Sequence, residues 1–575
     1  MMKRILCISF AVAVLASCNF LDQDPKVICQ EKFYSNTGDV ILGLASVYGP
    51  LNNLEIYGEY YSLDCSQTDD LCYFNRVNQT SFTNQYLHDA TTPLIGKMWD
   101  AMYAGVRNAN VFIEAVSKTS FDPDGSYVAE ARFIRAYYYW LLAQCWGDVP
   151  LRETQTASYE DIYCEVTPQR KVLEWVTSEM ENAIPMLPES LENAPSRVVR
   201  NTAKGILARV YLFMAGESVD GEPAVKHEYF GKAKNLCDEV IKSGRHSLNP
   251  SYSQVFINYI SDVYDKTYNE SMWEADFIGD RSTPSQWSNG RIGDLNGLLS
   301  SGGVNFSAYK CNFSYAMYSN TPKIWDLYWT TDRTDDEDQL DHVTDSRQDW
   351  NLPPYNYSGY TSSSYKMAPY GGSEFDVRDS LIGGIDKTPY HFVTTCTNDD
   401  PMFFVAGRNT GKFRREVCYE GQKTAKLLFT GINYPILRYS DVLLMYAEAV
   451  NEYEGGPTQD AYDCVKMVRT RAGVSTRDFS DYASQEGFRN FIRNERGREL
   501  CFESLRKYDL IRWGIFLDEM HGLIDQSQDP RWQAHGASTY AAAIGAAVKP
   551  KHVVLPIPSL ELAVNTKIKQ NPLWR

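Results

Sequence analysis

Two stretches of the chain repeat apolar residues at the spacing of amphipathic α-helices, and a long middle stretch does not. Apolar positions three and four residues apart lie on one face of a helix, which is the pattern of a helix that packs on a core. The pattern predicts helices over 93–117, 127–146, 168–187, 200–216 and 226–243 in the first stretch, and over 436–454, 457–472 and 486–507 in the last.

The helix predicted over 127–146 has the clearest end. Ile134, Tyr138 and Leu141 share its apolar face. Gly147 follows and can adopt a left-handed backbone, and Pro150 cannot continue a helix. We therefore expect the helix to stop at Trp146 and the chain to continue extended.

Consecutive helix pairs of about 30–40 residues are typical of a stacked solenoid of the tetratricopeptide kind. Between 246 and 434 the chain is instead rich in Gly, Ser, Asn, Pro, Tyr and Trp, which predicts loops, short strands and short helices. Its many aromatic residues argue against a disordered linker. The expected fold is mainly α, a tetratricopeptide-like helical-pair solenoid with a large irregular, aromatic-rich insertion. One intertwined domain would comprise 18–245, 246–434 and 435–575, after a signal peptide at 1–17.

The N-terminus has the pattern of a lipoprotein signal. Lys3 and Arg4 precede a short apolar run, too short to span a bilayer, and the run ends at Leu15-Ala-Ser-Cys18, which resembles a bacterial lipobox. We expect Cys18 to be acylated and to become the first residue of the mature protein. Contact with the membrane would then occur through the lipid alone, although an ordinary signal peptide with an incidental cysteine remains the alternative.

Composition narrows the classes of ligand. The 575 residues include 56 Lys and Arg and 73 Asp and Glu, so the net charge is −17. This charge argues against a protein that binds along the phosphate backbone of a nucleic acid, because such binding needs a positive surface. The ligand should be neutral or cationic. The 13 cysteines show no CxxC spacing, so neither a disulfide framework nor a zinc site is expected. The 39 Tyr and 12 Trp residues are the unusual feature.

The sequence lacks the common motifs of enzyme active sites. Residues 407–412 (GRNTGK) resemble a phosphate-binding loop but have three residues between the glycines, where four are required, so they predict a turn. The sequence contains no HExxH or GxSxG motif and no dinucleotide fingerprint. We expect no enzyme and no cofactor. An acidic run at 332–341 could hold a structural calcium ion, but it lacks the spacing of a calcium loop.

Several segments together resemble the SusD/RagB family of nutrient-binding outer-membrane lipoproteins of Bacteroidetes. The segments are 130–139 (EARFIRAYYY), 146–150 (WGDVP, with Trp146 where the family usually has Phe), 202–211, 438–449 (RYSDVLLMYAEA), 495–503 (ERGRELCFE), 508–514 (YDLIRWG) and 555–558 (LPIP). We interpret them as scaffold: Tyr137 should fill the core, and the pairs Arg438 with Asp441 and Glu499 with Glu503 should each share a helix face and brace neighbouring helices.

The resemblance implies a surface-exposed, lipid-anchored protein of the outer membrane. Its tetratricopeptide-like half would dock on a SusC-like TonB-dependent transporter, and the less regular half would capture oligo- or polysaccharide for delivery. The RagB branch of the family implies a peptide ligand as the alternative. A glycoside hydrolase with an unrecognised carboxylate pair is a weaker one, because such a pair needs only spatial proximity.

Sugars present apolar faces and hydroxyl edges, so a receptor needs aromatic rings for stacking and polar side chains for the hydroxyls. The family takes its ligand contacts from an early loop and the variable middle. Here the early loop is 57–75, and the expected contacts are Asp69, Asp70, Tyr73, Asn75, Trp287, Tyr309, Trp325, Trp329 and Trp350. We predict that two or three of the rings form a platform.

Overall fold

A computed structural model describes residues 33–76, 83–156, 158, 163–192, 195–278, 289–299, 314–329, 345–353, 355–361, 364–369, 375–376, 408–414, 429–474, 476, 478–482, 484–529 and 538–575. Of the predicted features, Cys18, Trp287, Tyr309, the acidic run at 332–341 and the side chain of Trp329 lie outside this description.

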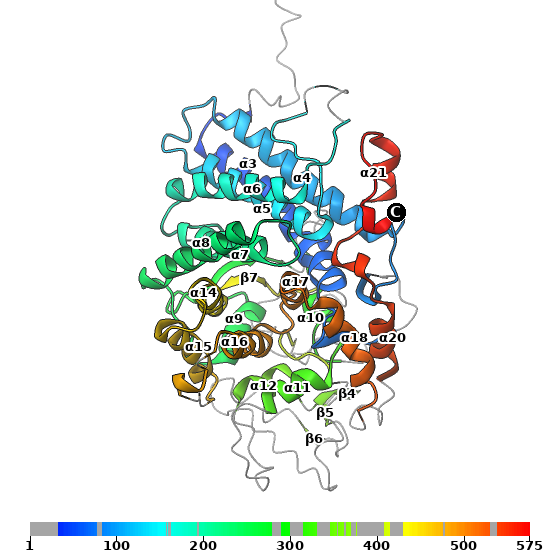
Figure 1. Cartoon of the computed structure of the whole chain (residues 1–575). Helices are drawn as coiled ribbons and strands as arrows, with labels where there is room; N and C mark the ends of the chain where they lie inside the picture. Colours follow the sequence, from blue (N-terminus) through cyan, green and yellow to red (C-terminus); the bar gives the residue numbers. More distant parts are fainter. Residues whose placement is uncertain are drawn as a thin grey trace, which may run out of the picture.

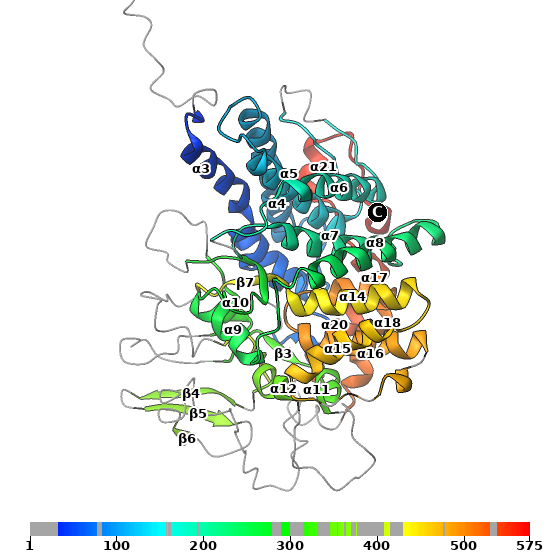
Figure 2. The same cartoon turned by 90° about the vertical axis from the view of Figure 1, so that its left-hand side faces the viewer.

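Paired helices stacked along the molecule form its larger part, as Figures 1 and 2 show. In sequence order they are α3 (Thr37–Tyr48), α4 (Pro93–Val116), α5 (Ser126–Trp146), α6 (Gln169–Ala183), α7 (Arg200–Ala215), α8 (Pro223–Lys242), α14 (Tyr439–Tyr453), α15 (Gln459–Arg471) and α16 (Gln485–Leu500). Helix α4 packs on α3 and α5, α5 on α6, α7 on α8, and α14 on α8, α15 and α16. The predicted mainly helical, solenoid-like fold is confirmed.

Helix α5 forms the centre of the core. Tyr137, Tyr138, Tyr139 and Trp140 are all buried, which confirms that this aromatic run packs inside the solenoid. The helix ends at Trp146, and Gly147 follows with φ of 75°, a left-handed value that glycine adopts without strain. The predicted stop is therefore confirmed.

The central part of the chain is built from short elements. They are α9 (Tyr252–Ser261), β2 (Ser271–Ala275), α10 (Ile292–Leu295), β3 (Tyr318–Asn320), α11 (Pro322–Trp329), α12 (Ser346–Asn351), β4 (Tyr355–Thr361), β5 (Ser364–Pro369), β6 (Phe375–Asp376) and β7 (Tyr434–Arg438). Strand β2 pairs antiparallel with β7, so the chain enters and leaves the region between them at one small sheet. Strands β4, β5 and β6 form a separate antiparallel sheet, at the lower left of Figure 2.

The C-terminal segment returns to the first half of the solenoid. It contains α17 (Arg506–Arg512), α18 (Phe516–Gln526), α20 (Ser538–Ala547) and α21 (Ser559–Val564). The backbone N–H of Leu555 donates to the carbonyl of Cys145 at 2.7 Å, and the Trp146 indole donates to the carbonyl of Pro556 at 3.0 Å. These bonds hold the 555–558 segment against the end of α5.

Three predicted boundaries were wrong. Residues 436–438 belong to strand β7, and the helix begins at Tyr439. The helix predicted over 486–507 is two helices, because the chain turns between them with left-handed backbone at Phe502 and Ser504. Part of the early loop is helical, with the π-helical turns Leu54–Gly58 and Tyr60–Cys65.

The scaffold pairs brace the fold, although not as expected. Arg438 ends a strand and Glu503 follows α16, so neither Arg438 with Asp441 nor Glu499 with Glu503 shares a helix. Arg438 instead bonds Glu499 and Glu503 across the core, and Asp441 bonds Arg209 and Arg496. All these side chains are largely buried. A buried charge is costly unless it is paired, and these ion pairs provide the compensating charges.

Candidate functional site

The early segment and the central region meet where β1 (Cys72–Phe74) pairs antiparallel with β3, Cys72 opposite Asn320 and Phe74 opposite Tyr318. The pairing continues past the strand, since the backbone N–H of Asn75 donates to the carbonyl of Met317 at 2.8 Å. We call residues 69–76 and 314–329 the junction. It brings together the two regions from which the sequence predicts ligand contacts.

Two of the predicted contacts, Asp69 and Asp70, are buried and fix the position of the early segment in the junction. The Asp70 carboxylate is fully buried and receives Nε and Nη2 of Arg506, each at 2.9 Å, and Nζ of Lys323 at 2.8 Å. Burial alone would raise the pKa of Asp70, but Arg506 and Lys323 hold it below its ordinary value. Asp70 thereby ties the early segment to α11 and α17.

The neighbouring Asp69 is also buried, and its Oδ1 accepts the backbone N–H groups of Leu71 and Cys72 at 2.8 and 3.0 Å. Burial, and then the charge of Asp70, raises the pKa of Asp69 well above its ordinary value. Asp69 therefore shapes the turn before β1. Tyr73, within that strand, is fully buried as well.

The outer edge of the junction carries polar groups and one ring. The Asn75 amide, which is partly buried, donates to the carbonyl of Ala316 at 3.0 Å and to the Ser319 hydroxyl at 2.7 Å. Arg76 donates to the Asn75 side-chain oxygen at 2.6 Å and to the carbonyl of Tyr315 at 3.0 Å. Tyr315 is 38% exposed. Asn75, Arg76 and Tyr315 are thus neighbours at the outer edge of the junction.

Asn75 is among the contacts predicted from the sequence, whereas Arg76 and Tyr315 are not. No pattern separates Tyr315 from Tyr318, which is buried three residues later, because exposure depends on the pairing of β3 with β1. Arg76 directly follows the predicted early loop. Its positive charge next to Asn75 is the one feature of the sequence that could have added it to the predicted ligand contacts.

Two tryptophans among the predicted contacts have described side chains, and both are buried. Trp325 in α11 is 9% exposed, with the Arg408 guanidinium 4.7 Å from the ring centre. Trp350 in α12 is 3% exposed; its indole donates to the carbonyl of Lys412 at 3.3 Å, and Arg414 lies 4.0 Å from the ring. These cation–π contacts make both rings part of the internal packing of the protein.

The segment that resembles a phosphate-binding loop, of which the structure describes 408–412, has a structural role. Lys412 is fully buried, and its ammonium group donates to Glu503 at 2.7 Å and to the carbonyls of Glu499 and Cys501. The charge of Lys412 is therefore engaged inside the protein.

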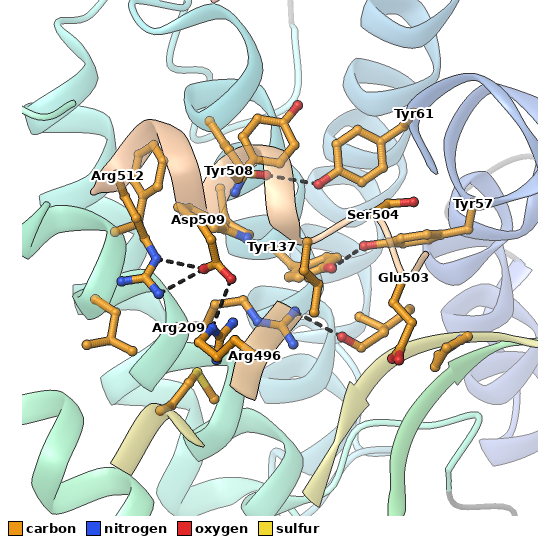
Figure 3. Close-up of a pocket in the computed structure, with 18 of the residues that line it drawn as sticks. Tyr57, Tyr61, Tyr137, Arg209, Arg496, Glu503, Ser504, Tyr508, Asp509 and Arg512 are labelled. Atoms are coloured by element: carbon orange, nitrogen blue, oxygen red, sulfur yellow. Dashed lines mark hydrogen bonds and ion pairs between the residues drawn. The ribbon is translucent and has the colours of Figure 1, made fainter. Parts of the chain in front are cut away.

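An internal cavity lies between the solenoid helices and the turn before α17 (Figure 3). Its volume is about 40 Å³, and Tyr57, Tyr61, Tyr137, Tyr434 and Tyr508 line it together with charged residues such as Arg209 and Asp509. Pockets that bind small molecules usually have volumes of about 300–1,000 Å³, whereas a cavity of about 10–15 Å³ can hold one water molecule. The cavity has room for a few water molecules and none for a sugar ring.

The polar groups around this cavity bond to one another. Figure 3 shows Asp509 between Arg496 and Arg512, with the carboxylate 2.9 Å from Nε of Arg496 and 2.8 Å from Nη2 of Arg512. The Tyr61 hydroxyl donates to the Gln144 side chain at 2.9 Å, and the hydroxyls of Tyr57 and Tyr137 bond each other. The cavity therefore belongs to the scaffold.

Within the described ranges, no group of three or more His, Cys, Asp or Glu side chains is arranged to hold a metal ion. Of the helices in the described part of the chain, none combines the length and apolar character needed to cross a bilayer.

Comparison with known proteins gives a consistent result. Residues 269–574 match the SusD family, and residues 19–212 match a family described as "Starch-binding associating with outer membrane". Among curated proteins, SusD-like protein P25 of Formosa agariphila is 24% identical over 98% of this chain and 97% of its own, and a SusD-like protein of Bacteroides ovatus is 26% identical over 38% of this chain and 40% of its own.

Solved structures share the fold. A SusD homologue from Bacteroides thetaiotaomicron has a TM-score of 0.78 at 24% identity, covering 95% of this chain and 98% of its own. A laminarin-binding SusD-like protein has a TM-score of 0.65 at 19% identity (94% and 100%), and the surface glycan-binding protein A of Bacteroides fluxus has 0.64 at 19% (93% and 99%). With a match over more than half of its length, the chain belongs to the SusD family.

Proposed function

We propose that this protein is a cell-surface glycan-binding lipoprotein that captures oligo- or polysaccharide and delivers it intact to a SusC-like TonB-dependent transporter. Family membership supports the class, and the structural neighbours include proteins named for binding laminarin and surface glycans. The observation that carries the proposal for this chain is the junction, where the two predicted ligand-contacting regions pair as neighbouring strands.

The chemistry of the junction suits a neutral sugar. Arg76 has donors left at Nε and Nη2, the Asn75 side-chain oxygen has a lone pair left beside its bond from Arg76, and Tyr315 supplies a ring against which the apolar face of a sugar can stack. The predicted contacts Trp287, Tyr309 and Trp329 remain part of this proposal, as rings against which a sugar would stack. Asp69 and Asp70 would contribute by fixing the strand that carries Asn75.

Location follows from the N-terminus and from the family. The lipobox at Cys18 supports a lipid anchor, and the description of the family matching 19–212 supports association with the outer membrane. Labelling cells that express the full chain with an alkyne analogue of palmitate should label the wild-type protein and leave Cys18→Ala unlabelled. Label on Cys18→Ala would place the lipid elsewhere or show that the anchor is misassigned.

The function is tested by incubating the purified protein with a panel of polysaccharides and with peptides, and by measuring both retention and new reducing ends. Retention of at least one glycan without new reducing ends supports a receptor. New reducing ends would show a glycoside hydrolase instead, and retention of peptides alone would show a RagB-type receptor.

A further inference from the structure

A hollow of ligand size lies far from the junction. It has a volume of about 310 Å³ and is bounded by α4, by the extended segment 150–156 and by α21. Helices α4 and α21 are in contact, and Figure 1 shows both near the top of the molecule, whereas α11 and α12 lie near the bottom. We call this the α4–α21 hollow and define it by the lining residues Trp99, Asp100, Tyr103, Arg107, Arg152 and Glu561.

The floor of the hollow is aromatic and fixed. The ring centres of Trp99 and Tyr103 are 4.9 Å apart, and Trp99 packs edge-on against Trp146 at 5.3 Å. The Tyr103 hydroxyl donates to the carbonyl of Pro150 at 2.7 Å. Trp99 is nearly buried and Tyr103 partly exposed, so Tyr103 is the ring that a ligand can reach.

The wall formed by 150–156 is held in place by side chains behind it. The Asn110 amide donates to the carbonyls of Arg152 and Thr154 at 3.1 and 3.0 Å, and the Tyr139 hydroxyl donates to the Arg152 carbonyl at 3.0 Å. Because these bonds already order the wall, a ligand would bind without the loss of free energy that ordering a loop requires.

Charge in the hollow is balanced. Asp100 and Glu561 offer acceptors only, and Arg107 and Arg152 donors only. Among the described residues, the side chains of Asp100, Arg107 and Glu561 form no hydrogen bond or ion pair with one another or with a neighbour. A balanced set of donors and acceptors favours a neutral ligand whose groups both donate and accept, and hydroxyl groups have that property.

We propose that the α4–α21 hollow is a second saccharide-binding site, which holds one or two sugar units against Tyr103 between Asp100, Arg107 and Glu561. The identity of the ligand rests on the proposed glycan-binding function; the site itself rests on the hollow. Two sites at opposite ends of the protein would bind one long polysaccharide, or two chains of it, more tightly than either site alone.

Other hollows fit this role less well. A hollow of about 400 Å³ between α7, α17 and α18 is lined largely by Phe, Leu, Ile and Val residues, and Glu217 and Asp518 are its only charged lining residues in the described structure. It lacks the guanidinium donors and the balanced charge of the α4–α21 hollow.

The test uses laminarihexaose and maltohexaose as probes and isothermal titration as the readout. The hollow variant is Asp100→Ala with Arg107→Ala, and the junction variant is Tyr315→Ala. Glu114→Ala with Lys118→Ala is the matched control, because it also removes one exposed acid and one exposed base, at the C-terminal end of α4 and in the turn that follows it. Melting temperatures establish that each variant is folded.

In the junction variant, residual binding of at least one probe should remain, and adding the hollow substitutions should weaken it about tenfold or more. The control pair should change nothing. If the wild type binds a probe and the hollow substitutions leave its affinity unchanged in both backgrounds, the inference is wrong and the proposed function stands. If a tripeptide of lysine binds at the hollow and neither sugar does, the site is not a saccharide site.

Discussion

Arg438 donates from Nε and Nη2 to the two carboxylate oxygens of Glu503, each at 2.8 Å, with both side chains buried. The same guanidinium reaches Glu499 at 3.0 Å, and Lys412 reaches Glu503 at 2.7 Å. Arg438 ends the strand at which the central region rejoins the solenoid, and Glu503 lies in the turn after α16. The pair therefore fastens the irregular half to the helical half.

Replacing Arg438 by Met should lower the free energy of unfolding by about 3–5 kcal/mol, because Glu499 and Glu503 would remain buried with fewer compensating charges. Chemical denaturation measures the change. Lys118→Met is the control: its partner Glu114 is exposed, and surface ion pairs of this kind contribute about 0–1 kcal/mol. Similar losses in the two variants would contradict a special role for the buried pair.

Helix α4 packs closely on α5 at Gly105, where an added Cβ would lie 2.3 Å from the Tyr138 ring. Alanine is normally the better helix former by about 0.5–1 kcal/mol. At this position the overlap should instead make Gly105→Ala destabilising, by about 1–3 kcal/mol.

Gly522 in α18 is the matched control, since no atom lies within 4 Å of its added Cβ, so Gly522→Ala should stabilise the protein. Thermal unfolding of both variants checks the opposite signs. A gain in stability for Gly105→Ala would show that the contact of α4 with α5 is looser than described.

His552 makes stability depend on pH below neutrality. Burial and the charges of Lys507 and Lys551 lower the pKa of His552 from its ordinary 6.5 to about 3. The centre of the His552 ring lies 5.1 Å from that of His88 and 5.5 Å from that of Trp574. The unfolded chain binds a proton at this residue below pH 6.5 and the folded chain does not. The free energy of unfolding should therefore fall as the pH decreases from about 6.5 towards 3.

Denaturation midpoints of wild type and His552→Gln at pH 7 and pH 5 test this. The substitution should reduce the loss of stability between the two pH values. An equal loss in both proteins would assign the pH dependence to other groups.

Glu274 should act in the opposite direction. Burial raises the pKa of Glu274 from 4.5 to about 8, the charge of Asp276 adds to the shift, and Asn433 donates to the Glu274 carboxyl at 2.9 Å. The folded chain thus holds a proton that the unfolded chain releases above pH 4.5. The associated stability is complete below pH 4.5 and is lost as the pH rises through 8.

Glu274→Gln removes this titration, so its free energy of unfolding should change less between pH 6 and pH 9 than that of the wild type. The comparison is made by denaturation in the same buffers. A wild-type protein that is equally stable at both pH values would contradict a protonated Glu274.

Local signals in the sequence predict most of the helical part of this fold. Gly147 and Pro150 mark the end of α5, and apolar spacing predicts the other long helices within a few residues. The signal fails where distant contacts decide: residues 436–438 have helical spacing but pair with β2, and the turn at Phe502 and Ser504 interrupts an otherwise continuous pattern.

The candidate site is less predictable for the same reason. An aspartate such as Asp70 is usually found at the surface. Its burial here depends on the ion pair with Arg506, which lies 436 residues away in sequence. Trp350 likewise has the character of a sugar platform in sequence but packs on Arg414 inside the protein. One sequence indicates which segments are rich in aromatic and polar residues, but it does not indicate which of these side chains are exposed in the fold.

The most direct test is the affinity of Tyr315 variants for a glycan that the wild-type protein retains. Titration calorimetry should show that Tyr315→Ala weakens binding about tenfold while Tyr315→Phe, which keeps the ring, stays within about threefold of wild type. The glycan should be recovered uncleaved. Equal affinity of Tyr315→Ala and wild type, or shortened glycan after incubation, would contradict a passive saccharide receptor built on the junction.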